Sequence, residues 1–215
     1  MENAIKTTEL RPRFRLSENV RYVHRDKDGN VKPLFEVNAF GKAILAAIRK
    51  FVKPYDENGD LKPGLLPRLA LYGVVLPFVT GRWVQEMELS NLITNAGAAG
   101  VASRINGAGS EAAFTYIAVG TGTNAASASD TTLQTELAAS GLSRAAATAS
   151  RVTTDVTNDT AQLVLTYTVT GTAAVTESGV FNASSSGVLL CRQTFSAINV
   201  VNGDSLQVTW KIDVD

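Results

Sequence analysis

The segment from Gly120 to Ala125, GTGTNA, has the spacing of a loose dinucleotide-binding fingerprint, whose glycines let the backbone approach a pyrophosphate. That chemistry needs a helix directly after the loop and a parallel crossover to the next strand. Residues 126–130 are instead alanine, serine and aspartate, and the later apolar segments alternate with polar residues as antiparallel strands do. The pattern therefore favours a turn at the end of a strand over a nucleotide site.

Two acidic turns resemble calcium-binding loops but lack residues that such loops need. The turn that begins at Asp56 has Leu61 at the glycine position, and the turn that begins at Asp26 has Val31 there. Both also lack the glutamate that closes a calcium loop. The sequence therefore predicts plain turns and no metal site.

Few other residues offer acid–base or nucleophilic chemistry. His24 is the single histidine and lies far in sequence from the serine-rich half, so we interpret it as an exposed or hydrogen-bonded structural residue. Glu177 is the one charged residue within an apolar strand segment, and we expect it to pair with Arg144, Arg151 or Arg192. No two carboxylates stand in a recognisable acid–base context. We predict no enzyme, no catalytic residue and no cofactor.

Composition argues against several classes of partner. The single cysteine, Cys191, excludes a disulfide within the chain and a multi-cysteine metal site. With 20 basic and 20 acidic residues the net charge is zero, which does not favour nucleic acid or an acidic membrane surface. The longest uncharged apolar run, residues 69–81, is shorter than the roughly 20 residues of a membrane-spanning helix and contains Gly73 and Pro77. We interpret this run as a buried core segment or a subunit contact.

The elements that position these residues fall into two predicted units, residues 1–88 and 89–215, because all six prolines precede Ser90 and the remainder is rich in Ala, Thr, Ser, Val and Gly. The first unit is predicted to be a small α+β docking unit with three elements. These are a hairpin that turns at residues 26–30, an amphipathic helix between Asn38 and Val52, and an extended loop from Pro54 to Pro67.

The second unit is predicted to be antiparallel β. A helix capped by Thr94 or Asn95 ends at Asn106-Gly107, and one or two helical turns are expected over Thr131–Leu137. In the last strand Leu206, Val208, Trp210, Ile212 and Val214 share one face, and the polar residues between them share the other. The fold class is therefore mainly β, with a C-terminal antiparallel β-sandwich or jelly-roll-like domain that we expect to fold without residues 1–88. Six strands are expected, at residues 114–119, 147–155, 161–170, 173–181, 188–196 and 205–214.

Several short motifs of the second unit occur together in a recognisable order. They are Thr94 to Gly97, Phe114 to Thr123, Asp130 to Leu137, Val175 to Phe181, Leu189 to Arg192, Phe195 and Gly203 to Trp210. Through them residues 91–214 resemble a recurrent domain of tailed-bacteriophage structural proteins. The resemblance implies a virion component of the capsid surface, neck, tail or fibres, and it implies no catalytic residues.

We therefore predict an oligomeric accessory capsid, neck or tail protein, made in the host bacterial cytoplasm, that joins other virion subunits through its N-terminal unit and displays the β domain. The alternative is a receptor- or glycan-binding module of a tail fibre or tail tip, which needs an exposed aromatic platform for a host-surface glycan or receptor. An enzyme is a third and weaker hypothesis. The residues predicted to dock on a partner are Arg11, Arg13 and Arg15, on one face of a strand, and Leu69, Leu71, Val74 and Val75 in the apolar run.

Overall fold

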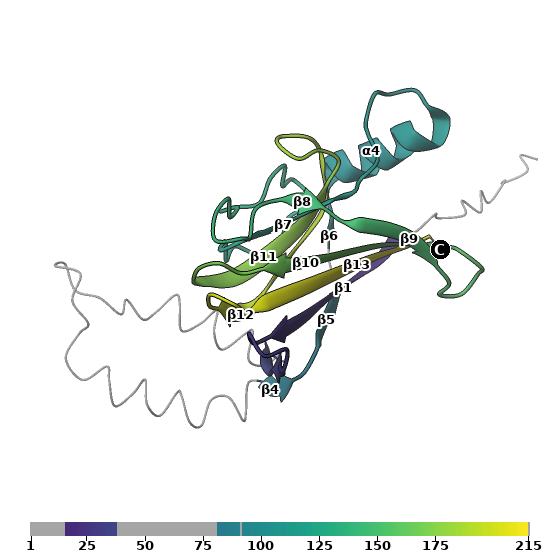
Figure 1. The fold of residues 1–215 in the computed structure, drawn as a ribbon. Helices are drawn as coiled ribbons and strands as arrows, with labels where there is room; N and C mark the ends of the chain where they lie inside the picture. The colour runs from purple at the N-terminus through teal and green to yellow at the C-terminus, as the bar shows by residue number, and fades with distance from the viewer. Residues whose placement is uncertain (1–15, 38–80, 91, 215) are drawn as a thin grey trace, which may run out of the picture.

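The computed structural model describes residues 16–37, 81–90 and 92–214 (Figure 1). These residues form antiparallel β-sheets and one helix, so the prediction of a mainly β chain is confirmed.

The larger sheet has six strands and is built around the last strand of the chain. Its order is β2-β1-β13-β10-β9, and β5 also pairs with β1. The six strands are β1 (Leu16–Arg25), β2 (Val31–Lys32), β5 (Met87–Ser90), β9 (Thr148–Val152), β10 (Thr160–Thr168) and β13 (Ser205–Val214).

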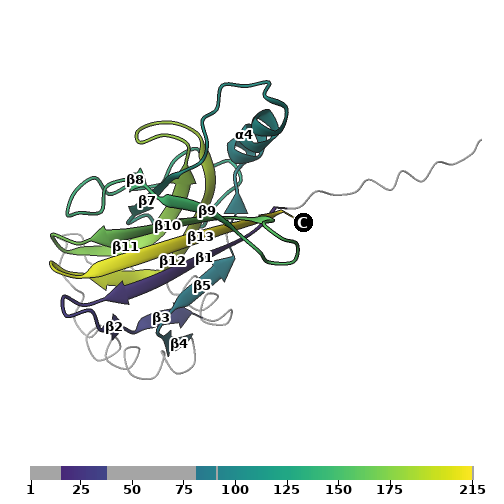
Figure 2. The same cartoon turned by 45° about the vertical axis from the view of Figure 1, so that its right-hand side comes forward.

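The second sheet has five strands in the order β6-β12-β11-β7-β8. A separate two-stranded sheet joins β3 to β4 and lies near β5, as Figure 2 shows. The strands of these two sheets are β6 (Leu92–Ile93), β7 (Tyr116–Gly120), β8 (Ala145–Ala146), β11 (Ala173–Phe181), β12 (Leu189–Val200), β3 (Leu34–Val37) and β4 (Gly81–Val84).

The first described strand and the last strand of the chain are partners. β1 pairs with β13 from Leu16 opposite Val214 to Arg25 opposite Ser205, over the full length of both strands. Because β2 and β5 pair with the other edge of β1, this strand is internal to the sheet. The predicted division between residues 1–88 and 89–215 stays a prediction, and strands from both sides of it share this sheet.

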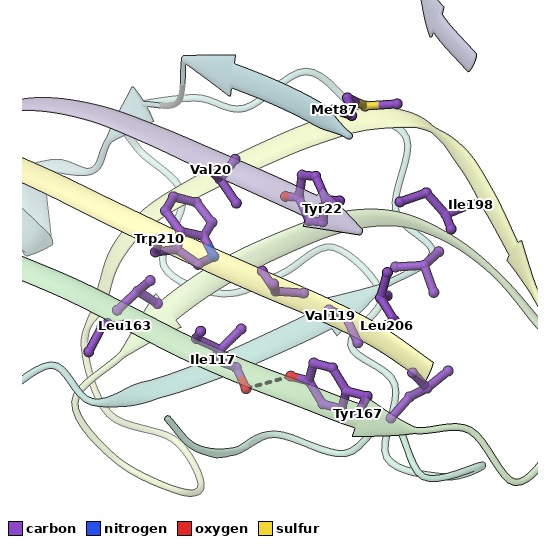
Figure 3. Packing of buried hydrophobic residues seen from close by; sticks show 14 of the residues in the cluster. Val20, Tyr22, Met87, Ile117, Val119, Leu163, Tyr167, Ile198, Leu206 and Trp210 are labelled. Carbon is purple, nitrogen blue, oxygen red and sulfur yellow. Dashed lines mark hydrogen bonds between the residues drawn. The ribbon is translucent and has the colours of Figure 1, made fainter. Parts of the chain in front are cut away.

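Side chains from both large sheets meet in one buried core (Figure 3). Tyr22 and Trp210 of the six-stranded sheet are fully buried in the same cluster as Val180 of the five-stranded sheet. The hydroxyl of Tyr167 on β10 donates a 2.8 Å hydrogen bond to the carbonyl oxygen of Ile117 on β7. This bond ties the two sheets together through the core.

The face assignment of β13 is confirmed at the centre of the strand and wrong near its end. Leu206, Val208 and Trp210 are fully buried, as predicted. Asp213, predicted to face water, is only 8% exposed because it accepts a hydrogen bond from Thr160, whereas Val214 is 44% exposed. Thr209, on the polar face, is also buried, at 5% exposed.

The helix α4 (Asn95–Asn106) has the predicted ends. The Thr94 hydroxyl accepts a hydrogen bond from the Gly97 amide at 2.9 Å, and Gly107 ends the helix in the left-handed conformation at φ 68°. A β-carbon at Gly97 would lie 2.2 Å from the carbonyl oxygen of Leu190, so glycine is what lets the helix pack directly against β12.

Two other element predictions are confirmed. β11 has the predicted bounds, and β1 and β2 form the predicted hairpin around residues 26–30. The helix predicted between Asn38 and Val52 and the loop predicted from Pro54 to Pro67 lie outside the described residues.

The helical turns predicted over Thr131–Leu137 are wrong. These residues form bends and a single bridge between Gly120 and Glu136. The amides of Gln134 and Thr135 donate to the side chain of Glu177, so they are not available for the hydrogen bonds of a helix.

Candidate functional site

The most deeply buried charge in the described chain is Glu177, at the centre of β11. Its side chain is 0% exposed, and it accepts hydrogen bonds from three backbone amides. The amides of Gly122 and Thr135 lie 2.9 and 2.7 Å from Oε1, and that of Gln134 lies 3.0 Å from Oε2. Arg192 on β12 adds a hydrogen bond of 2.8 Å to Oε2. Groups of the same chain therefore satisfy both oxygens of this buried carboxylate, which indicates a structural role.

Arg192 completes the cluster from the other side. It pairs with Glu177 and with Asp130, each at 2.8 Å, and donates to the carbonyl oxygen of Asn124 at 3.1 Å. Its side chain is only 2% exposed. The prediction that Glu177 pairs with one of three arginines is therefore confirmed, and the partner is Arg192.

This cluster explains the glycine-rich segment. The amide of Gly122 donates to Glu177, and the amides of Thr123 and Asn124 both donate to the side-chain oxygen of Gln134 at 2.9 Å. A β-carbon at Gly120 or Gly122 would lie 2.5 Å from Oε1 of Glu177. The glycines therefore admit a carboxylate of the same chain, and the amides that a phosphate would need are already occupied.

A second ion pair ties the same region to the end of β11. Arg144 makes hydrogen bonds of 2.9 and 2.6 Å to the two carboxylate oxygens of Glu136. Its guanidinium lies 3.5 Å from the centre of the Phe181 ring, and it donates to the carbonyl oxygen of Ser186. With the Glu177 cluster, this pair fastens residues 121–137 to the five-stranded sheet.

The third buried group of charges holds the β1–β2 hairpin to the turn before β13. Nε2 of His24 lies 2.7 Å from Oδ2 of Asp204, and Lys32 donates to the same oxygen at 3.0 Å. Burial alone would raise the pKa of Asp204, but hydrogen bonds from the Val201 amide, His24 and Lys32 outweigh it and lower this pKa to about 2. Of the two readings of His24, the hydrogen-bonded structural residue is the correct one.

The outer face of the six-stranded sheet carries a small polar hollow of about 140 Å³. It crosses four neighbouring strands, β5, β1, β13 and β10, on the face opposite the core. Its lining is entirely polar or charged and consists of Asn19, Arg21, Glu88, Gln162, Thr209 and Lys211.

One aromatic pair is exposed on the small sheet. Phe35 on β3 and Trp83 on β4 are cross-strand partners, with ring centres 5.3 Å apart and planes at 62°. Trp83 is 65% exposed, whereas Leu34, on the other face of the same ribbon, is buried in the core. An exposed tryptophan held against a second ring is a surface that a partner can bury.

The predicted docking residues lie outside the described residues: Arg11, Arg13, Arg15, Leu69, Leu71, Val74 and Val75. In the described ranges, no three His, Cys, Asp or Glu side chains are grouped as a metal ion would require. No helix in the described part of the chain is long and apolar enough to cross a membrane.

Neither surface feature follows from the sequence alone. The alternating polar residues of the strands indicate a solvent-exposed face. The hollow, however, forms only where four particular strands lie beside one another, and the sequence does not show which strands are neighbours. Trp83 lies on the short strand β4, which pairs with β3, a strand that ends 44 residues before β4 begins.

Comparison of this chain with protein-family models, with curated proteins and with solved structures finds no match.

Proposed function

We propose that the protein is a structural component of a bacteriophage virion, an accessory capsid, neck or tail protein. In this proposal the two large sheets, which include β1 and β2, form a β-sandwich that is displayed on the particle. The unit of residues 1–88 supplies the docking surface, and the described part of that surface is the separate β3–β4 ribbon. The virion assignment rests on the resemblance of residues 91–214 to phage structural domains.

The position of the resembling motifs supports a structural role. Gly120 to Thr123, Asp130 to Leu137, Glu177 and Arg192 belong to different motifs of the sequence, and all of them meet in the buried cluster. The charged groups in this cluster bind other groups of the same chain. Their arrangement serves to hold the loop against the sheet.

The observation that carries the docking part of the proposal is the exposed ring of Trp83. Tryptophan is enriched among the residues that dominate binding at protein interfaces, and Trp83 lies within the predicted docking unit. Its ring contacts Phe35 edge to face, which restricts the ring and lowers the side-chain entropy that a partner would have to remove.

Complementation tests this proposal directly. In a phage that lacks the gene, wild-type protein supplied from a plasmid is expected in purified mature particles, detected by mass spectrometry and located by cryo-electron microscopy. Trp83→Ala is expected to lower its copy number at least tenfold, since truncating a central interface residue costs about 2 kcal/mol or more.

The matched control is Ile105→Ala, which also removes a large exposed apolar side chain, 72% exposed, but from α4. This variant is expected to join particles normally. Absence of the wild-type chain from mature particles would reject the virion role, and loss of incorporation with Ile105→Ala alone would move docking to the β domain.

A further inference from the structure

The polar hollow on the outer sheet is formed by two adjacent rows of cross-strand neighbours. In one row, Arg21 of β1 lies between Glu88 of β5 and Thr209 of β13. In the next row, Lys211 of β13 lies between Asn19 of β1 and Gln162 of β10. Residues two apart on one strand share a face, so all six side chains point to the same side of the sheet.

Most of the hydrogen-bonding capacity of these side chains is unused. Among the described residues, the side chains of Asn19, Glu88, Thr209 and Lys211 make no hydrogen bond or ion pair with one another or with other groups. Arg21 uses one nitrogen, 2.9 Å from Glu86, and the remaining nitrogens of its guanidinium are free to donate. Donors and acceptors therefore converge on one small volume without satisfying each other.

The hollow is lined by charges of both signs, so an ion of either sign meets at least one like charge there. Arg21 and Lys211 repel a cation, while Glu88 lies across the strand from Arg21 and repels an anion. A neutral ligand that both donates and accepts hydrogen bonds at several positions meets no such repulsion. A sugar ring has this chemistry, because each hydroxyl is both a donor and an acceptor.

The size of the hollow points to one ring. Its volume of about 140 Å³ is well above the roughly 10 to 15 Å³ that a cavity needs to hold one water and below the roughly 300 Å³ of a pocket for a drug-sized ligand. Thr209 lines the hollow together with five longer polar side chains. We propose that this hollow binds one neutral sugar unit of a larger saccharide through hydrogen bonds, without the aromatic platform expected of a glycan-binding tail module. This activity is separate from the assembly role and does not depend on it.

Nuclear magnetic resonance titration of the isotope-labelled full chain tests the proposal. The probes are neutral oligosaccharides of glucose, galactose, mannose and N-acetylglucosamine, with oligogalacturonate as an anionic probe and chitosan oligomers as cationic probes. At least one neutral probe is expected to shift the amide signals around Arg21, Thr209 and Lys211. The anionic and cationic probes are expected to bind more weakly than their neutral counterparts.

Three variants and a control locate the binding. Thr209→Val, Glu88→Gln and Lys211→Met should each weaken the affinity for that probe about fivefold to tenfold, as expected for one lost hydrogen bond. Thr166→Val changes an exposed residue of β10 on the same face but outside the hollow, and should leave affinity unchanged. Thermal melting of each variant checks that the fold is intact.

Several results would overturn the proposal. One is that no neutral probe shifts the signals of the hollow; another is that only a charged probe binds there. Binding that survives the three hollow variants but is lost in Trp83→Ala would place a sugar site on the aromatic pair and reject the hollow.

Discussion

Arg192 and Glu177 are diagonal neighbours on the paired strands β12 and β11, with Nη2 and Oε2 2.8 Å apart and side chains only 2% and 0% exposed. The pair connects three segments of sequence, since Arg192 also holds Asp130 and Glu177 also holds the amide of Gly122. Removal of either charge would leave the other buried without its main counter-ion.

Arg192→Met is therefore expected to lower the free energy of unfolding by about 3 to 5 kcal/mol, the cost of breaking a buried ion pair from one side. Urea denaturation followed by circular dichroism measures the change. Arg21→Met is the control, because its pair with Glu86 is exposed and should contribute less than about 1 kcal/mol. Equal losses in the two variants would mean that the buried pair is no more important than a surface pair.

Trp210→Ala is expected to destabilise the fold by about 3 to 5 kcal/mol, a large part of the roughly 5 to 15 kcal/mol that stabilises a typical domain. The side chain is fully buried, and its indole nitrogen donates to the hydroxyl of Ser178 at 3.2 Å. Thermal melting should show a much lower midpoint. Trp83→Ala removes an exposed ring of the same type and should shift the midpoint little; a reversed order would contradict the assignment of the core.

Asp204 is expected to make stability depend on pH in the acid range. Its pKa falls from 3.8 to about 2 on folding, so its contribution is present above about pH 4 and is lost as the pH falls toward 2. The shift corresponds to about 2 kcal/mol. Asp204→Asn should therefore be less stable than wild type at neutral pH, and the two proteins should converge near pH 2.

Urea denaturation at a series of pH values measures this difference. The control is Asp28→Asn, which changes an exposed carboxylate in the same part of the molecule. If the free energies of unfolding of wild type and Asp204→Asn differ by the same amount from pH 7 to about pH 2, the charge of Asp204 does not stabilise the fold.

The pairing of β1 with β13 leads us to reverse the sequence-based expectation that residues 89–215 fold alone, and this fragment is now expected to fail to fold. The alternating strands of the fragment favour an independent domain. However, β1 pairs with β13 along its whole length, and its residues Val20 and Tyr22 belong to the shared core. Without β1 that part of the core would face water. A fragment of residues 16–215 keeps this strand and should fold.

Amide spectra of the two fragments distinguish these outcomes by signal dispersion. A well-dispersed spectrum for residues 89–215 would show that β1 is dispensable and would support the predicted division of the chain at residues 88 and 89.

Local sequence predicts local structure well in this protein. The alternating residues of β13 define that strand, β11 has its predicted bounds, and Thr94 and Gly107 mark the ends of α4. Glu177 stands out as a charge in an apolar strand, but the choice of Arg192 over Arg144 and Arg151 depends on β12 lying beside β11. Strand order is set by contacts between distant segments, and the periodicity of a single segment does not predict it.

The same limit explains the elements that the sequence does not reveal. The pairing of β1 with β13 joins residues almost at opposite ends of the chain. The bends over residues 131–137 arise because Glu177, more than 40 positions away, captures two amides. The composition of that short segment suits a helical turn, and a tertiary hydrogen bond overrides it.

The antiparallel pairing of β1 with β13 also determines how the protein would respond to force. The start of β1, at Leu16, lies opposite the end of β13, at Val214. From the other end of β1, at Arg25, the chain continues through β2 to β3. Tension between the two chain ends would peel the strands apart one hydrogen bond at a time. Tension between the C-terminal end and the β3–β4 ribbon would instead pull the strands past each other, so that the whole ladder resists at once. The protein is therefore expected to unfold at low force when it is pulled by its two chain ends, and to resist higher force when it is pulled by the C-terminal end and the β3–β4 ribbon.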